Sequence, residues 1–186
     1  MMVIPNKVLV FAAHQDDETI GCGGAIYRHY LKGDEVYCLS FTDGVSARDK
    51  VKKKDLKNRI NSSIKASKIL KFKWVENKKL FEDNKLDSYP LLDLVKVIEK
   101  VKNRINPDIV YTHYFNDLNV DHKAVSMATI TAFRPLKKEK CKEILMLAAD
   151  DMDYKTMAEI IKTPIGTVMS RLANCRKESR KDCSWN

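Results

Sequence analysis

The chain has 186 residues, of which 44% are apolar and 32% are charged, with only 6 glycines and 5 prolines. This composition is typical of a folded protein and argues against a disordered one, and the length allows one domain with a small accessory module. The formal charge of +9 favours polyanionic partners such as nucleic acid, acidic membrane surfaces or phosphorylated small molecules, but does not choose among them.

Two features of the sequence bear on the cellular compartment. No apolar run approaches the roughly 20 residues that cross a bilayer, and the start of the chain lacks the cationic and small-residue features of a signal peptide. The five cysteines are scattered and never form a C-x-x-C pair, so neither a disulfide framework nor a cysteine zinc site is indicated. We therefore expect a cytoplasmic protein with reduced thiols.

Up to about Pro135, short β-rich apolar runs alternate with longer segments of helical period. Strands are predicted at 7–14, 35–44, 108–114 and, most weakly, 72–81. Helices are predicted at 17–31, 50–70, 90–105 and 121–133. Strands that are apolar on both faces and separated by helices indicate an α/β fold, in which helices cover both faces of a parallel sheet.

The unusual polar residues follow the ends of these predicted strands. His14 follows the first strand, Asp43 ends the second, and His113 ends the last. In open parallel sheets, ligands bind beyond the carboxyl ends of the strands, where the direction of winding reverses. A functional site is therefore expected at this edge of the sheet.

The acidic turn after the first strand has the composition of a metal site. His14 and Asp17 lie three residues apart and can direct an imidazole nitrogen and a carboxylate oxygen at one ion, with Asp16 beside it. Candidates for a third ligand follow the last strand: His113, Asp117, Asp121 and His122. His122 opens a helix and is our choice. A catalytic zinc typically keeps three protein ligands and a position for water, whose pKa falls to about 7 on the metal.

From the residues alone, a second interpretation of this turn stays open. In it, His14 is a hydrogen-bonded structural histidine, and the neighbouring acids face the positive end of the helix that follows.

The two motifs together resemble a known family. AHQDDETIGCGG and the later THYFNDLNVDHKAV resemble the LmbE-like, or PIG-L, family of zinc-dependent N-acetylglucosaminyl deacetylases, whose signature is A-H-P-D-D-E followed by H-x-D-H. The resemblance covers residues 7–135 and implies a Rossmann-like fold. It also implies that His14, Asp17 and His122 hold zinc while Asp16 acts as general base towards the metal-bound water. The implied reaction is hydrolysis of the N-acetyl amide of a glucosamine-type sugar.

The sequence departs from the family pattern at the second motif, where Asn119 replaces the first histidine of H-x-D-H. Asn119 can donate a neutral hydrogen bond to the oxyanion but cannot carry the charge of an imidazolium, so we expect weaker support of the transition state unless His113 substitutes. Gln15 replaces the usual proline without removing a ligand. We assign catalytic roles to Asp16, Asn119 and Asp121. We assign substrate contacts to Asp43, Arg59 and His113.

The sequence changes character after residue 135, where the family ordinarily continues through further strands. From Cys141 onward no strand is predicted, and 142–149, 154–162 and 165–181 all have helical period. We therefore predict a domain boundary near 136–140, between a shortened α/β domain at 1–135 and an all-α module at 136–186.

The last segment has the spacing of a helix-turn-helix, with a break at Lys162 followed by a Thr163 cap and Pro164 in the first turn of the second helix. Four residues on the outward face of that helix could enter a major groove: Thr167, Ser170, Arg171 and Asn174. The net charge from residue 162 to 181 is +5, which suits phosphate contacts. An ordinary helical hairpin with a basic solvated face is the alternative.

This segment, including TPIGTVMSRLANCRK, resembles region 4 of sigma-70-type factors, and LKKEKCKEILML resembles the helix that precedes that region. The resemblance implies duplex DNA and RNA polymerase as partners. Three hypotheses follow for the whole chain. The favoured one is a zinc amidohydrolase acting on an N-acetylglucosamine conjugate, because its two motifs supply a complete set of reacting groups. The others are a DNA-binding regulator with a weak or inactive α/β domain, and a recombined reading frame with neither activity.

Overall fold

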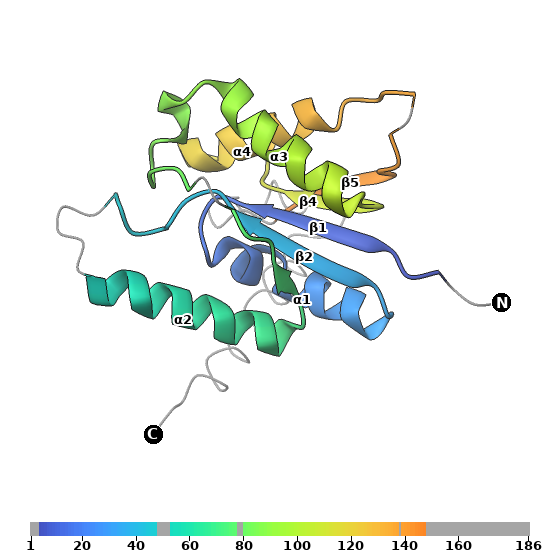
Figure 1. Ribbon diagram of the computed structural model, residues 1–186, viewed down its shortest axis with the longest axis horizontal. Coiled ribbons are helices and arrows are strands. Elements are labelled where there is room, and N and C mark those ends of the chain that lie inside the picture. Colours follow the sequence, from blue (N-terminus) through green and yellow to red (C-terminus); the bar gives the residue numbers. More distant parts are fainter. Residues whose placement is uncertain (1–3, 48–52, 78–79, 138, 148–186) are drawn as a thin grey trace, which may run out of the picture. The chain divides into compact units, whose positions relative to one another are not determined.

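The protein is described from a computed structural model that covers residues 4–47, 53–77, 80–137 and 139–147. Its centre is a five-stranded sheet with the order β3-β2-β1-β4-β5, in which every neighbouring pair is parallel (Figure 1). The strands are β1 (Lys7–Ala12), β2 (Glu35–Ser40), β3 (Lys73–Trp74), β4 (Ile109–Thr112) and β5 (Glu143–Met146). The predicted parallel sheet is thus confirmed.

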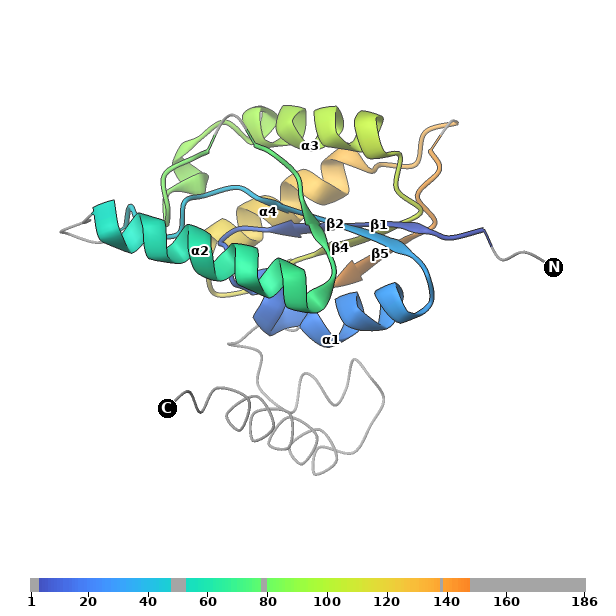
Figure 2. The same cartoon turned by 60° about the horizontal axis from the view of Figure 1, so that its bottom comes forward.

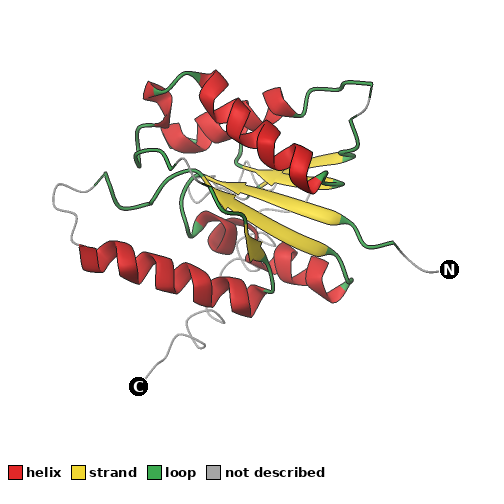
Figure 3. Cartoon of the chain, in the orientation of Figure 1, coloured by secondary structure: helices red, strands yellow, loops and turns green. Residues whose placement is uncertain are grey.

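Helices cover both faces of this sheet, as predicted. They are α1 (Asp17–Leu31), α2 (Lys53–Leu70), α3 (Leu91–Ile105) and α4 (Val120–Ala132), with a short 3-10 turn η1 (Leu86–Ser88) before α3. Figure 2 shows α1 and α2 on one face and α3 and α4 on the other. The same alternation of strands and helices is coloured by type in Figure 3.

Strand β1 owes its central place to side chains that are apolar on both faces. Val8, Val10 and the residues between and after them up to Ala12 are fully buried. Leu9 and Phe11 join the core cluster under α3 and α4, whereas Val8 and Val10 join the cluster under α1. Because side chains alternate across a strand, this continuous apolar run fits only a strand that is covered on both sides.

The order of the strands fixes where a ligand can bind. The chain winds outward from β1 through β2 to β3, then returns to the other side of β1 with β4 and β5. The winding therefore reverses between β1 and β4, and the crevice beyond their carboxyl ends is the expected ligand site. Strand β4 pairs directly with β1, since Val8 to Val10 lie in register with Ile109 to Tyr111.

Strand β5 corrects one prediction. The period of 142–149 predicts a helix, and 136–147 resembles a sigma-factor helix, but Glu143–Met146 forms a parallel strand beside β4. The N–H of Leu147 donates to the carbonyl of Thr112 at 2.7 Å. A short apolar run such as EILM has no decisive period, so the open edge of β4 decided its conformation.

The sheet therefore continues past the boundary predicted at 136–140. The described residues belong to one compact unit. The predicted helix-turn-helix lies outside the described residues, as do its four predicted DNA-contacting residues Thr167, Ser170, Arg171 and Asn174.

Candidate metal centre and the adjoining pocket

Two loops that are distant in the chain bring the three expected metal ligands together. His14 and Asp17 follow β1, and His122 stands in the first turn of α4, which follows β4. Donor atoms of the three side chains all lie within 4.8 Å of one another. Oδ2 of Asp17 is 3.2 Å from Nδ1 of His14 and 3.4 Å from Nε2 of His122. Ligand atoms 2.0–2.1 Å from a tetrahedral zinc lie about 3.3 Å apart, so the donor set and its spacing fit zinc.

A buried carboxylate orients His122. Nδ1 of His122 lies 2.9 Å from Oδ2 of Asp117, whose side chain is almost completely buried. Donation of the Nδ1 proton to Asp117 leaves Nε2 free to face Asp17. This arrangement of a carboxylate behind a histidine is common around zinc, where it fixes the tautomer and the ring orientation.

Two further carboxylates lie behind His14. Its Nε2 is 3.0 Å from Oδ1 of Asp83 and 3.1 Å from Oδ2 of Asp121. Asp121 also accepts the backbone N–H groups of Asn84 at 2.7 Å and Leu86 at 2.9 Å. Asp121, expected to be catalytic, therefore ties α4 to the turn before η1 and holds the ring of His14.

His113 lies deeper than the sequence suggested. Its side chain is 3% exposed, and its ring stacks on that of His122 with centroids 3.9 Å apart. Nε2 of His113 accepts the backbone N–H of Ala13 at 2.9 Å, which makes it a neutral imidazole with its proton on Nδ1. Burial lowers the pKa of His113, in agreement with the neutral form. This placement supports the ring of His122 and leaves little surface for the substrate contact that was expected of His113.

Two other groups of described residues lie close enough to share an ion: His113 with Asp117 and His122, and His14 with Asp83 and Asp121. In each, one member already has its lone pairs engaged by backbone N–H groups: His113 in the first group and Asp121 in the second. In the group of His14, Asp17 and His122, Asp17 accepts a single backbone N–H, that of His14, and keeps further lone pairs for an ion. This group is therefore the better ligand set.

The charges of the cluster are strongly coupled. Burial opposes protonation of His14, but hydrogen bonds to Asp121 and Asp17 outweigh it and raise the pKa to about 10. Burial likewise opposes ionisation of Asp17, yet contacts with His113, His122 and His14 hold its pKa well below the usual range. The pKa of His122 is raised against the effect of burial, chiefly by Asp17. In the absence of a cation, protonated imidazoles balance the carboxylates, and a metal ion would supply the same positive charge.

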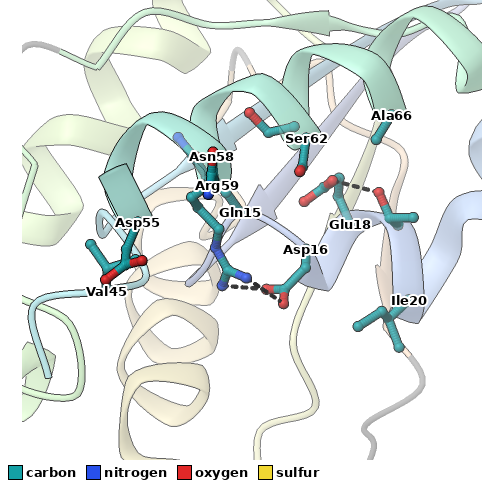
Figure 4. A pocket seen from close by; sticks show the side chains of 12 residues that line it. Gln15, Asp16, Glu18, Ile20, Val45, Asp55, Asn58, Arg59, Ser62 and Ala66 are labelled. Atoms are coloured by element: carbon teal, nitrogen blue, oxygen red, sulfur yellow. Dashed lines mark hydrogen bonds and ion pairs between the residues drawn. The ribbon is translucent and has the colours of Figure 1, made fainter. Parts of the chain in front are cut away.

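Asp16, the expected general base, faces away from this cluster towards α2. Its two carboxylate oxygens accept from Nη1 and Nη2 of Arg59 at 2.9 and 3.0 Å (Figure 4). Gly44 leaves room for the guanidinium, because a Cβ at that position would lie 2.8 Å from Nη2, and its φ of +66° favours glycine. Asp43, expected to contact substrate, accepts the backbone N–H groups of Val45 and Ser46 and so shapes the loop that carries Gly44.

Asn119, expected to support the oxyanion, caps helix α4. Its Oδ1 accepts the N–H of Asp121 at 2.9 Å and that of His122 at 3.4 Å. This cap sets the first turn of α4 and with it the position of His122. The carbonyl oxygen is thereby engaged, so the side-chain NH2 group is what Asn119 can offer to a substrate.

A pocket of about 460 Å³ adjoins the metal cluster between α1 and α2. Asp16 and Arg59 line it together with Gln15 and Glu18 from the N-terminal side and Ser62 from α2. The sequence motifs predicted the acids of the turn but not the roles of Asp83, Asp117 or this pocket. Asp83 stands in a loop with no distinctive pattern, and only its contact with His14 reveals it.

Comparisons with known proteins agree with the geometry. A family model described as PIG-L, GlcNAc-PI de-N-acetylase, matches residues 9–133. The chain is 31% identical over 134 residues to the uncharacterized deacetylase YaiS of Escherichia coli (strain K12), with 69% of each chain covered. Among the described residues, no helix is both long and apolar enough to cross a membrane.

Two solved structures share the fold at lower identity. N,N'-diacetylchitobiose deacetylase from Pyrococcus horikoshii is 20% identical, with a TM-score of 0.63 over 83% of this chain and 66% of its own. The 4-carboxy-2-hydroxymuconate hydratase GalB from Pseudomonas putida KT2440 is 23% identical, with a TM-score of 0.55 over 77% of this chain and 62% of its own. The chain thus spans about two thirds of the length of these proteins. Since a deacetylase and a hydratase share this fold, the fold alone does not decide the reaction.

Proposed function

Since the chain belongs to the PIG-L family of de-N-acetylases, we propose that it hydrolyses the N-acetyl amide of an N-acetylglucosamine-type conjugate with the help of a zinc ion. One observation carries the proposal. His14 and His122 converge on Asp17 with the spacing of zinc ligands, while Asp16, the neighbour of Asp17 in the sequence, pairs with Arg59 in the adjoining pocket. Two imidazoles, a ligand carboxylate and a spare carboxylate make up the set of groups that hydrolytic zinc sites use.

His14, Asp17 and His122 are the proposed ligands. When bound, zinc supplies Lewis acidity that polarises the acetyl carbonyl and lowers the pKa of water near it. Asp117 and Asp121 do not reach the substrate in this proposal. They are positioning residues, which act through the rings of His122 and His14 respectively.

Asp16 is the proposed general base. It takes a proton from the attacking water and later gives one to the leaving nitrogen, so that the carbon–nitrogen bond breaks into acetate and a free amine. Arg59 holds both oxygens of Asp16 and, because it lines the same pocket, would also contact the sugar in this proposal. The NH2 group of Asn119 would donate to the oxygen of the acetyl group as negative charge develops there.

The test combines metal analysis with acetate release. Zinc-loaded protein is expected to hold one zinc per chain and to release acetate from N-acetylglucosamine conjugates. Asp16→Asn should keep its zinc but lose activity by about 10²–10⁴-fold, the usual contribution of a general base. His122→Ala should lose both.

Asp87→Asn is the matched control, because Asp87 is an exposed carboxylate on η1 outside the metal cluster. Its zinc content and activity should match those of the unchanged protein. A protein that binds no zinc at micromolar concentration, or an Asp16→Asn variant with full activity, would contradict the proposal.

A further inference from the structure

Helix α2 is exposed over most of its surface, although it belongs to a layer that covers the sheet. Ser63 is the one buried residue among its eighteen, and the Ser63 carbonyl accepts the indole N–H of Trp74 in β3 at 3.2 Å. Helix α3, on the opposite face of the sheet (Figure 2), buries five apolar side chains. A helix of such a layer normally turns its apolar stripe towards the core. Most of the apolar side chains of α2 therefore do not serve the core.

Three of these side chains form a row on the surface, which we call the α2 stripe. Leu56, Ile60 and Ile64 recur every four residues and so lie on one side of the helix. These three residues are 37–42% exposed. None of them lines the pocket between α1 and α2, whose wall takes Asp55 and Ser62 from another side of the helix. A row of exposed aliphatic side chains is typical of surfaces that meet another apolar surface.

Lysines surround the α2 stripe. The helix carries five exposed lysines: Lys53, Lys54, Lys57, Lys65 and Lys68. Three of them stand three or four residues from a member of the stripe and are therefore its neighbours on the helix surface: Lys53, Lys57 and Lys68. The one acid of α2, Asp55, lines the pocket instead, and Arg59 is paired with Asp16. The exposed surface of α2 is thus apolar along one line and positively charged around it.

The charge of this surface selects an anionic partner. Two copies of the chain that met through α2 would bring their lysines together, and like charges repel. The α2 stripe separates the remaining candidates. Nucleic acid presents mainly phosphates and sugars to a helix on its surface, which give aliphatic side chains little apolar contact. A bilayer with anionic lipids offers phosphates to the lysines and acyl chains to the stripe, and the lysine stems can lie along the apolar side chains.

We propose that α2 lies on the surface of an anionic lipid bilayer, parallel to the membrane plane, as an amphipathic interfacial helix. In this arrangement the α2 stripe enters the boundary between head groups and acyl chains, and the five lysines lie among the anionic head groups. Such binding concerns the exposed surface of α2 and requires neither zinc nor turnover. The proposal therefore stands or fails independently of the proposed function.

The first test reverses the charge of α2. Sedimentation with vesicles of phosphatidylcholine and phosphatidylglycerol in equal amounts measures the partition of the full chain, with excess chelator present. Lys57→Glu, Lys65→Glu and Lys68→Glu together should weaken this partition about a hundredfold, since each lysine near an anionic surface contributes about fivefold. Raised salt, or vesicles of phosphatidylcholine alone, should weaken the binding of the unchanged protein as well.

The matched control makes the same change of charge on the opposite face of the sheet. Lys96→Glu, Lys100→Glu and Arg104→Glu alter three exposed residues of α3 and should change the partition by about threefold at most, because these charges lie far from the bilayer. Urea unfolding of both triple variants should match that of the unchanged protein, as expected for exposed residues. Equal weakening by the two triple variants would mean that only net charge counts, and would overturn the proposal.

The second test concerns the α2 stripe. Ile60→Ser should weaken the partition into anionic vesicles about tenfold and leave its salt dependence unchanged, because the variant removes aliphatic surface and no charge. Ile60→Trp should show a blue shift of its emission when these vesicles are added. Leu92→Ser and Leu92→Trp are the matched controls on α3, where Leu92 is 58% exposed, and should show neither effect.

Two outcomes of these measurements refute the bilayer as the partner. An unchanged partition of Ile60→Ser, or an emission of Ile60→Trp that does not shift, would leave α2 as a purely electrostatic surface. Tighter binding of random-sequence duplex DNA than of anionic vesicles at the same salt, lost in the α2 triple variant, would assign the surface to nucleic acid instead.

Discussion

At the scale of residues, one carboxylate oxygen of Asp17 has contacts with several histidines. Oδ2 of Asp17 accepts the N–H of His14 at 2.8 Å and lies within 3.4 Å of an imidazole nitrogen from each of His14, His113 and His122. Nε2 of His113 is itself a hydrogen-bond acceptor, because it accepts the N–H of Ala13. Hydrogen bonds alone therefore do not satisfy every acceptor in this cluster. A cation held by Asp17, His14 and His122 would balance the charge of Asp17 without protons on those two rings.

Asp117 provides a test of how the cluster is supported. Asp117→Asn removes the charge that holds Nδ1 of His122, and the expected result is a zinc affinity lower by about 10–100-fold, the usual effect of losing such a partner. Competition with a coloured chelator measures this affinity. Asp87→Asn again serves as the control and should bind zinc like the unchanged protein. Unaltered affinity in Asp117→Asn would show that the carboxylate does not orient His122.

Asn119 has two roles, as the cap of α4 and as the proposed donor to the oxyanion, and a change to histidine would separate them. Asn119→His restores the imidazole of the family pattern, and a charged donor to the oxyanion should raise kcat by about tenfold over a neutral one. The same change removes the side-chain cap of α4 and should destabilise the fold by about 1 kcal/mol. Steady-state kinetics and urea unfolding measure the two effects. A lower kcat with unchanged stability would contradict both assignments.

At the scale of elements, the loop after β2 and helix α2 position the proposed base together. Gly44 adopts a φ of +66°, and the guanidinium of Arg59 occupies the space that a side chain at position 44 would need. Arg59 in turn holds Asp16, which precedes the first turn of α1. Three elements that are separate in the sequence thus meet at one ion pair beside the metal cluster.

Gly44→Ala tests this arrangement. The new Cβ clashes with Arg59, and the positive φ costs about 1–2 kcal/mol for a residue other than glycine. We expect loss of stability, a large fall in kcat and an unchanged zinc content. Gly24→Ala is the matched control, because Gly24 lies in α1 with open space where its Cβ would be. That variant should be fully active and no less stable than the unchanged protein.

Asp108 joins the starts of three strands and gives stability a defined pH dependence. Oδ2 of Asp108 accepts the N–H of Lys7 at 2.9 Å and lies 3.2 Å from Nζ of Lys140, just before β5. The hydrogen bond from Lys7 lowers the pKa of Asp108, burial opposes it, and Lys140 adds to the lowering. A carboxyl with a lower pKa in the folded state stabilises the fold above its unfolded pKa of about 3.9, and this contribution is lost as the pH falls below that value.

The measurement is urea unfolding from pH 3 to 7 for the protein and for Asp108→Asn. The variant should be less stable by a constant amount above about pH 5, and the difference should shrink as the pH falls through about 4. A difference that grows on acidification would have the wrong sign for this account.

At the scale of the whole molecule, the metal cluster joins the two halves of the sheet. His14 and Asp17 belong to the half that begins with β1, and Asp117 and His122 belong to the half that contains β4 and α4. Asp121 adds the turn before η1 through its two backbone contacts. A bound ion therefore links segments more than a hundred residues apart. Its removal should lower the stability of the entire α/β unit.

Metal removal provides the test at this scale. Zinc at a hundred times its dissociation constant should stabilise the fold by about 2.7 kcal/mol, and excess chelator should abolish the gain. Because protons must leave His14 and His122 for the metal to bind, zinc affinity should rise with pH and binding should release protons. Thermal unfolding with and without zinc at pH 6 and pH 8 measures the stabilisation by zinc and its dependence on pH. His14→Ala should show no stabilisation at either pH.

The sequence by itself determined the α/β pattern and the three ligand candidates. Runs such as that from Val8 to Ala12 are apolar on both faces and predict buried parallel strands, while His14, Asp17 and His122 follow strands whose ends meet at one edge. These inferences need only local periodicity and the rule that relates strand order to the site. Residues 148–186 lie outside the described part of the chain, so the predicted helix-turn-helix stays a prediction.

Only the tertiary structure decided the rest. The EILM run of β5 became a strand because β4 offered unpaired backbone groups, and no local pattern carries that information. Asp83 and Asp117 gained their roles through contacts with His14 and His122, and Arg59 reached Asp16 across 43 residues of sequence. Side-chain partners of this kind depend on how separate elements pack together, and packing is set by the whole chain rather than by any segment of it.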